Sequence, residues 1–280
     1  MLARSRVYET VISPGFYIAQ AIGLVLAYLL VSGFVQAVDS SGLNFSLNPV
    51  YDLINRSLQG AFGATMVDKL FAEGPFLLIL YVASLPVLAY LAVSSVFRFG
   101  LEKRVGALEL LAYGPSDGTS YFMAFLVKDL LLTALYLVVL LVFLWITAAL
   151  NNLILGPTFF FTLVVLFFLA MAIDAYGIFV STLTDNSASA VALFLGVNLL
   201  FLVLLMGSFT IFSGYVRSLS SVFAWVVKWF SPLFWWNLGL QSVEVGGWAL
   251  YFSSLAILMG LSAVLLVASH FILKARGVRP

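Results

Sequence analysis

The sequence predicts an all-α polytopic membrane protein, from its composition, its hydropathy and the length of its apolar runs. Of its 280 residues, 63% are hydrophobic and only 9% are charged, whereas soluble domains carry roughly 25% charged residues. The mean hydropathy is +1.13. Several apolar runs exceed the ~20 residues that a helix needs to cross about 30 Å of hydrocarbon. These runs lack the alternating pattern of barrel strands. Because only helices and closed barrels satisfy the backbone hydrogen bonds within a bilayer, the runs are predicted to be helices.

Hydropathy predicts six spanning helices, and an even number places both termini on one side. They cover residues 14–36, 75–97, 121–149, 158–183, 188–212 and 249–273. The first run is of spanning length and has no small-residue cleavage site, so we expect it to be retained. We expect residues 1–280 to form a single transmembrane domain, because no repeat, low-complexity tract or soluble domain boundary interrupts them.

The basic residues are divided unequally between the two sides that six spans define. Nine of the 13 Lys and Arg residues fall on the side of the termini, namely Arg4, Arg6, Arg98, Lys103, Arg104, Lys128, Lys274, Arg276 and Arg279. The other side receives Arg56, Lys69, Arg217 and Lys228. Cytoplasmic loops carry the excess of Lys and Arg. The termini are therefore predicted to be cytoplasmic.

Two segments on the outer side, 38–73 and 214–247, are too long to be turns. Apolar residues recur in both at intervals of three or four, which is typical of helices. We expect helices that lie on the outer leaflet or dip into it. Their pattern fits a surface-lying connector as well as a gate.

Charged residues gather in one long stretch, 98–129, between the second and third predicted spans. At about 100° per residue, Leu101, Val105 and Leu108 share one helical face, and Glu102 and Glu109 share an adjacent one. The pattern predicts a short amphipathic cytoplasmic helix over 100–113, which Gly114-Pro115 ends. This helix is either a solvated element at the lipid headgroups or a docking element for a partner. Two carboxylates on one face favour docking, because basic residues alone would serve lipid better.

The same residues resemble a known family. The run E-K-R-V-G-A-L-E-L-L at 102–111, followed by Pro115, is similar to the E-x-R-x-G-T-L-E-L-L-x-x-x-P signature of ABC-2-type permeases, the membrane subunits of ATP-driven exporters. FVSTLTDNSASA at 179–190 resembles that family's link between its fourth and fifth helices. The ending from Ser231 resembles the branch of gliding-motility and nitrous-oxide-reductase maturation permeases. Ala107 departs from the usual Thr, and Ala124-Phe125 stands where a Gly-Lys pair often begins the third helix.

The resemblance implies that residues 99–114 are a coupling helix, held in a cleft of a separate ATP-binding subunit, and that 1–13 form an interfacial elbow helix. Glu102 and Glu109 would pair with basic groups there, while Leu108 and Leu111 would be buried. The residues implied in coupling are Glu102, Arg104, Gly106, Leu108, Glu109, Leu110, Leu111 and Pro115.

The resemblance also implies the partners of the chain. They are two ATP-binding subunits, a second or related permease and the lipid bilayer, and nucleic acid is not an expected partner. The implied location is the cytoplasmic (inner) membrane of a prokaryote.

The chain is not expected to be an enzyme. A phosphate-binding Walker A loop requires a Gly-Lys pair, and the sequence contains none. The absence of cysteine excludes disulfides, thiolate metal sites and cysteine nucleophiles. We expect no catalytic, cofactor or metal site in this chain, and we expect ATP and Mg²⁺ to bind to the partner ATPase.

Asp174 is the only carboxylate predicted to lie well inside a span, ~14 Å from the cytoplasmic end of the fourth helix. A charge at that depth should face protein or water. It is a candidate contact in a translocation path, or else a structural group paired with Tyr176, a serine or a backbone carbonyl.

Two alternative functions of the chain remain, an ion-coupled secondary transporter and a non-transporting membrane assembly protein. The first would require ionisable residues clustered at mid-membrane.

Overall fold

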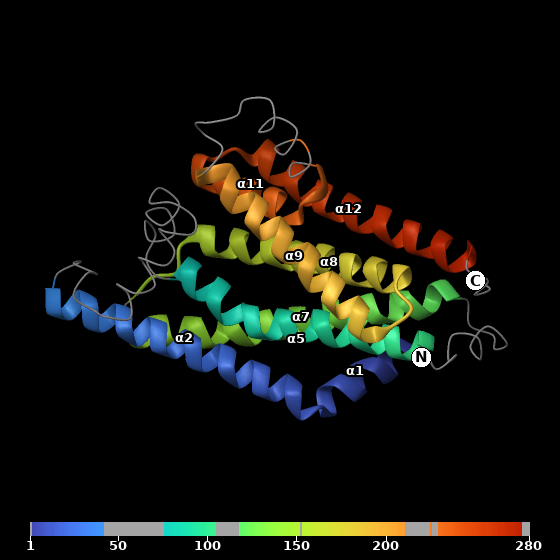
Figure 1. Ribbon diagram of the computed structural model, residues 1–280. Coiled ribbons are helices and arrows are strands. Elements are labelled where there is room, and N and C mark those ends of the chain that lie inside the picture. The colour runs from blue at the N-terminus through green and yellow to red at the C-terminus, as the bar shows by residue number, and fades with distance from the viewer. Residues whose placement is uncertain are drawn as a thin grey trace.

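The computed structural model describes residues 2–41, 76–104, 118–151, 153–210, 225 and 229–275. These residues form an elongated bundle of helices (Figure 1) and contain no strand. The helices are α1 (Leu2–Ile12), α2 (Pro14–Ser41), α5 (Phe76–Arg104), α7 (Gly118–Leu150), α8 (Pro157–Leu183), α9 (Ser187–Thr210), α11 (Pro232–Val245) and α12 (Trp248–Ala275). Helix α8 is central, because it contacts α5, α7, α9, α11 and α12.

Five of these helices are long and apolar enough to cross a membrane, which confirms the multi-pass helical class. They are Pro14–Val35 within α2, Phe76–Arg104, Met123–Leu150 within α7, Pro157–Leu183 and Trp248–Ala275. Helix α9 lies where the fifth span is expected, and its residues Ser187–Val203 are apolar. Six spans and the side of the termini therefore stay predictions.

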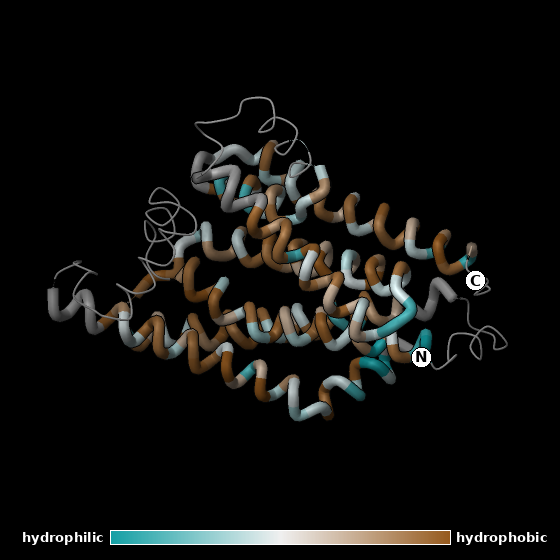
Figure 2. Tube along the Cα trace, in the orientation of Figure 1, coloured by the Kyte–Doolittle hydropathy of each residue, from teal (hydrophilic) through white to brown (hydrophobic). Residues whose placement is uncertain are grey.

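Both chain ends lie at the same end of the bundle, which we call the terminal end; the opposite one is the far end (Figure 1). Hydrophilic residues gather at the terminal end around α1 and the turn between α8 and α9, whereas the helices between the two ends are mostly hydrophobic (Figure 2). Large apolar side chains face outward along the bundle, including Leu131 at 55%, Val138 at 56% and Val264 at 65% exposure. Such faces are expected where lipid is the solvent.

Helices α2, α5 and α7 approach one another closely at Gly23. The Tyr136 hydroxyl of α7 donates a hydrogen bond of 2.6 Å to the Ala83 carbonyl of α5. A Cβ atom at Gly23 would overlap that hydroxyl and lie 2.5 Å from the same carbonyl oxygen. Small residues permit helices to approach this closely in membranes.

We expect Gly23→Val to destabilise the protein by about 1–3 kcal/mol, because overpacking a well-filled contact forces the neighbouring helices apart. The measurement is the melting temperature of the purified protein in detergent. Gly260→Val in α12 is the matched control, since nothing lies within 4 Å of a Cβ at Gly260. Equal melting temperatures for the two variants would contradict the packing.

Helix α11 enters the bundle instead of lying along its surface. Just before its first residue, the Phe230 carbonyl accepts a hydrogen bond from the Tyr176 hydroxyl of α8, which lies ~28 Å along α8 from Pro157. Further along α11, Gly239 packs against Val165 of α8. The part of segment 214–247 that forms α11 therefore runs from deep in the bundle toward its far end. Its position relative to the outer leaflet stays a prediction. Segment 38–73 lies outside the described residues from position 42 onward.

Helix α5 is longer at its C-terminal end than the predicted span 75–97. It continues without interruption to Arg104, so the boundary expected between the span and a helix at 99–114 is absent as far as Arg104. Residues 105–117 lie outside the described part of the chain. Glu102 and Lys103 therefore project from the last turns of a spanning helix.

Candidate functional site

Charged side chains connect α1 to the last turns of α5 at the terminal end. Both terminal nitrogens of Arg6 donate hydrogen bonds to the Glu102 carboxylate, Nη1 to Oε1 at 2.5 Å and Nη2 to Oε2 at 2.7 Å. The side chains are 17% and 20% exposed, and the Arg6 guanidinium lies 5.0 Å from the Phe125 ring centre of α7. A two-point pair between guanidinium and carboxylate fixes orientation as well as distance. The more exposed Glu9 accepts a hydrogen bond of 3.2 Å from Arg98.

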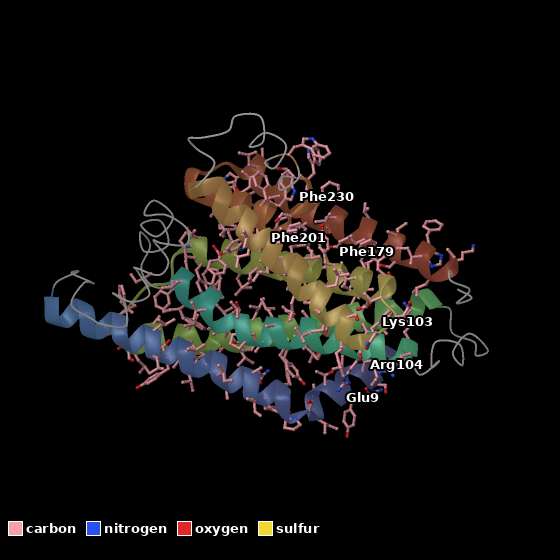
Figure 3. All side chains as sticks on the ribbon, in the orientation of Figure 1. Glu9, Lys103, Arg104, Phe179, Phe201 and Phe230 are labelled. Atoms are coloured by element: carbon pink, nitrogen blue, oxygen red, sulfur yellow. The ribbon has the colours of Figure 1, made fainter. Side chains whose placement is uncertain are left out.

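Lys103 connects the last turns of α5 to a second neighbour, the turn between α8 and α9. Its ammonium group donates hydrogen bonds to the backbone carbonyls of Thr182 at 3.1 Å and Thr184 at 2.6 Å. It also lies 3.3 Å from Oδ1 of Asp185. A cation is favoured at the C-terminus of a helix, where the last carbonyls lack intrahelical partners. Figure 3 labels Glu9, Lys103 and Arg104 at this end of the bundle.

Tight packing reinforces the contact between α5 and α9. A Cβ atom added at Gly100 would lie 2.9 Å from the Cα atom of Ser187, the first residue of α9. The end of α5 is thus held to α1 by Glu102 and to the α8–α9 turn by Lys103. We call these contacts of Arg6, Glu102, Lys103 and Gly100 the α5 clamp. The last turns of α5 are therefore attached to a neighbour on each side.

The α5 clamp gives Glu102 a partner within the chain, while its predicted role in coupling stays a prediction. The sequence predicts that Glu102 pairs with basic groups of an ATP-binding subunit, but its carboxylate is bound to Arg6 within the chain. Arg104 is exposed at the end of α5. The other six residues implied in coupling lie outside the described residues, namely Gly106, Leu108, Glu109, Leu110, Leu111 and Pro115.

We expect Glu102→Gln to lower the free energy of unfolding by about 1–3 kcal/mol, because it removes one charge from a partly buried, doubly hydrogen-bonded pair. Glu9→Gln is the matched control. Its side chain is 47% exposed, and exposed ion pairs contribute only about 0–1 kcal/mol. Chemical unfolding of the two variants in detergent measures the difference. Equal losses would show that the pair of Arg6 and Glu102 is no stronger than a surface contact.

A second charged group lies inside the bundle. Lys128 and Asp129 of α7 are 1% and 0% exposed, and Lys128 Nζ lies 2.9 Å from Asp129 Oδ1. The same ammonium donates a hydrogen bond of 2.6 Å to the Ser95 hydroxyl of α5. Asp174 of α8, which is 6% exposed, interacts electrostatically with both Lys128 and Asp129. We call Lys128, Asp129 and Asp174 the buried charge cluster.

The prediction that Asp174 is the only carboxylate well inside a span was therefore wrong. Asp129 follows Met123, where the candidate span within α7 begins, by six positions, which is ~9 Å along the helix, and its side chain is fully buried. The sequence analysis assigned Asp129 to the charged stretch 98–129, although the third predicted span already contained it. An adjacent Lys-Asp pair inside an apolar run was the available signal, because ionisable groups in membranes pair with one another. The suggested pairing of Asp174 with Tyr176 is also absent, since the Tyr176 hydroxyl binds the Phe230 carbonyl.

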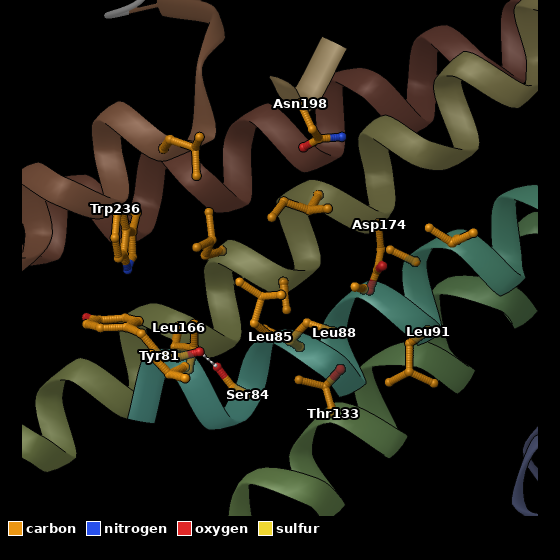
Figure 4. Close-up of a pocket in the computed structure, with 18 of the residues that line it drawn as sticks. Tyr81, Ser84, Leu85, Leu88, Leu91, Thr133, Leu166, Asp174, Asn198 and Trp236 are labelled. Carbon is orange, nitrogen blue, oxygen red and sulfur yellow. Dashed lines mark hydrogen bonds between the residues drawn. The ribbon is translucent and has the colours of Figure 1, made fainter. Parts of the chain in front are cut away.

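Beside Asp174 lies a cavity of about 440 Å³, whose lining comes mainly from α5, α8, α9 and α11. Most of its lining is aliphatic, including Leu85, Leu88 and Leu166 (Figure 4). Two lining residues are also strongly exposed, Leu85 at 66% and Leu195 at 51%. The cavity therefore opens sideways, at the surface between α5 and α9.

The polar groups of the cavity differ in their hydrogen bonding. Ser84 and Asn198 donate to backbone carbonyls within their own helices, whereas other polar groups have no partner among the described residues. The Thr133 hydroxyl and the Trp236 indole N–H are buried and unpaired. No hydrogen bond to the Asp174 carboxylate is found among the described residues. Figure 4 shows Trp236 and Asp174 on opposite sides of the leucines between them. Buried polar groups usually have partners, so these three are candidates for contact with a bound molecule.

The chain was compared with family models, with characterised proteins and with solved structures, and none of the three comparisons found a match.

Proposed function

We propose that this chain is the membrane subunit of an ATP-driven exporter of the ABC-2 type. It would have six spans and cytoplasmic termini, would form half of a translocation path and would assemble with a second permease and two ATP-binding subunits. The observation that carries the proposal is the α5 clamp, together with the signature that starts at Glu102. A docking element must pass its movement to the membrane helices, and Glu102 and Lys103 connect the start of that element to α1, α8 and α9.

The placement of the helix ends supports the same function. The last turn of α5, the first turn of α7, helix α1 and both chain ends all lie at the terminal end (Figure 1). Helix α5 ends and helix α7 begins there, on the side that the distribution of Lys and Arg predicts to be cytoplasmic. ATP-binding subunits are soluble and would meet the bundle on that side.

Affinity purification from native membranes tests the proposal. We expect the tagged chain to bring down a protein with a Walker A loop, in a complex that survives mild detergent. The Glu102→Gln variant should recover less of it, because a loosened α5 clamp leaves the docking segment poorly positioned. Failure to recover any nucleotide-binding protein would contradict the proposal.

The buried charge cluster favours a second candidate, the ion-coupled secondary transporter. Its three ionisable side chains are buried inside the bundle, and one of them, Asp174, lines the cavity. Proton and ion relays use such buried ionisable groups. The two candidates differ in the chain's activity in isolation. A secondary transporter in proteoliposomes carries protons or Na⁺ down an imposed gradient without ATP, and a pH-sensitive or Na⁺-sensitive dye reports it. The exporter proposal predicts no such flux from the chain alone.

A further inference from the structure

We propose that the cavity beside Asp174 binds a lipophilic monocation, an apolar molecule with a single ammonium group that pairs with the Asp174 carboxylate. The inference that such a molecule is the cargo rests on the proposed function, but its binding to the cavity does not.

The charges of the buried charge cluster leave the Asp174 carboxylate without a counter-ion in the part of the chain that the structure describes. Lys128 contributes one positive charge, while Asp129 and Asp174 contribute two negative charges when ionised, so the cluster has a formal net charge of −1. The Lys128 ammonium is already committed to Asp129 at 2.9 Å and to Ser95 at 2.6 Å. Asp174 is left without a counter-ion at hydrogen-bond distance among the described residues. A buried charge is costly unless it is paired, so a cation beside Asp174 would be bound favourably.

The volume and lining of the cavity fit a small molecule with an apolar body. At about 440 Å³, it falls within the roughly 300–1,000 Å³ of small-molecule sites. Its walls are aliphatic along α5 and α8, so they select an apolar body and give no contacts to a second charge. A lining with a few convergent polar groups is typical of such sites. Dications and hydrophilic solutes would leave polar groups facing leucine side chains, and they are therefore disfavoured.

The unpaired polar groups orient the ligand. Thr133 of α7 lines the cavity together with Asp174, and its free hydroxyl can accept a further hydrogen bond from an ammonium group. The unpaired Trp236 N–H on the opposite side can donate to an acceptor on the ligand or to a water molecule. The ammonium end is thus directed toward α7 and α8, and the apolar body toward α11.

The opening of the cavity indicates the route. Leu85 and Leu195 at its mouth are 66% and 51% exposed, and both belong to apolar helices of the bundle. An amphiphilic cation concentrates in the membrane, because its apolar body partitions into hydrocarbon. It can enter sideways between α5 and α9 without crossing water.

Saturable binding to the purified chain in nanodiscs of zwitterionic phosphatidylcholine tests the proposal. The probes are radiolabelled n-dodecylammonium and its neutral, chain-matched analogue n-dodecanol, each corrected for partitioning into empty nanodiscs. We expect the ammonium probe to bind at least tenfold more tightly than the alcohol, with one site per chain. Equal binding of the two probes would show an apolar lipid cavity and would overturn the proposal.

Two variants locate the site. Asp174→Asn preserves size and removes the charge, so we expect the Kd of the ammonium probe to rise at least tenfold and that of the alcohol to stay unchanged. Asp185→Asn is the matched control, because this carboxylate is 85% exposed in the turn between α8 and α9 and is not among the described lining residues of the cavity. Ala89→Trp places a ring at an exposed position of the cavity wall, and it should weaken both probes. Unchanged ammonium binding in either Asp174→Asn or Ala89→Trp would overturn the assignment. Because no ATPase is present, these results do not depend on the exporter proposal.

Discussion

Lys128→Met is expected to lower the free energy of unfolding by about 3–5 kcal/mol, the usual consequence of removing one partner from a buried ion pair. The methionine matches the lysine stem in length, so the packing against Phe125 is retained, where the ammonium now lies 5.6 Å from the ring centre. What is lost is the positive charge. Asp129, at 0% exposure, then keeps a buried carboxylate without a counter-ion. Thermal and chemical unfolding in detergent measure the loss.

Two further variants separate charge from packing. Lys128→Met combined with Asp129→Leu removes both charges, and we expect stability close to wild type, since an apolar pair of similar volume often replaces a buried ion pair without loss. Lys274→Met in the last turn of α12 is the control for an exposed lysine. Wild-type stability of the single Lys128 variant would show that its ammonium does not neutralise Asp129.

The second large effect is expected at Leu108, in the predicted docking segment. Leu108→Asp should abolish ATP-driven transport and the recovery of the ATPase subunit, while the permease remains folded in the membrane. The reason is that burial of Leu108 and Leu111 in the partner would anchor the segment, and a buried unpaired carboxylate is strongly unfavourable. Co-purification and the melting temperature of the chain are measured together.

A charge variant at the neighbouring position sharpens this prediction. Glu109→Arg replaces a negative charge, which is expected to pair with basic groups of the partner, by a positive one. It should therefore also weaken co-purification of the ATPase subunit. Leu101→Asp is the matched control, because Leu101 is 42% exposed in the last turns of α5. Wild-type transport and complex recovery in the Leu108 and Glu109 variants would refute the docking assignment.

Much of the fold could be predicted because hydropathy reports directly on membrane helices. Five predicted spans coincide with long apolar helices, and their ends differ by a few residues, except at α5. The continuation to Arg104 was missed because the charged residues from Arg98 onward, among them Glu102 and Lys103, ended the apolar pattern. Their charges are satisfied by Arg6 and by the C-terminal carbonyls of α8, which are contacts far apart in sequence.

The candidate sites were less predictable for the same reason. The sequence singled out Asp174 by its depth, but it could not place Lys128 and Asp129 beside it, because that requires the packing of α7 against α8. The cavity depends on four helices and on the depth of α11, which no local pattern encodes. Trp236 of α11 lines the cavity, and its ring lies edge-on to that of Tyr81 with 5.1 Å between the ring centres.

Site-specific crosslinking tests the central claim, that segment 105–117 contacts an ATP-binding subunit. The chain contains no cysteine, so Glu109→Cys provides a unique attachment point for a photoactivated crosslinker in native membranes. Ile154→Cys, at an 87% exposed position between α7 and α8, is the control at the far end. The account predicts an adduct between position 109 and a protein with a Walker A loop, and none from position 154. No adduct from position 109, or the same adduct from both positions, would contradict it.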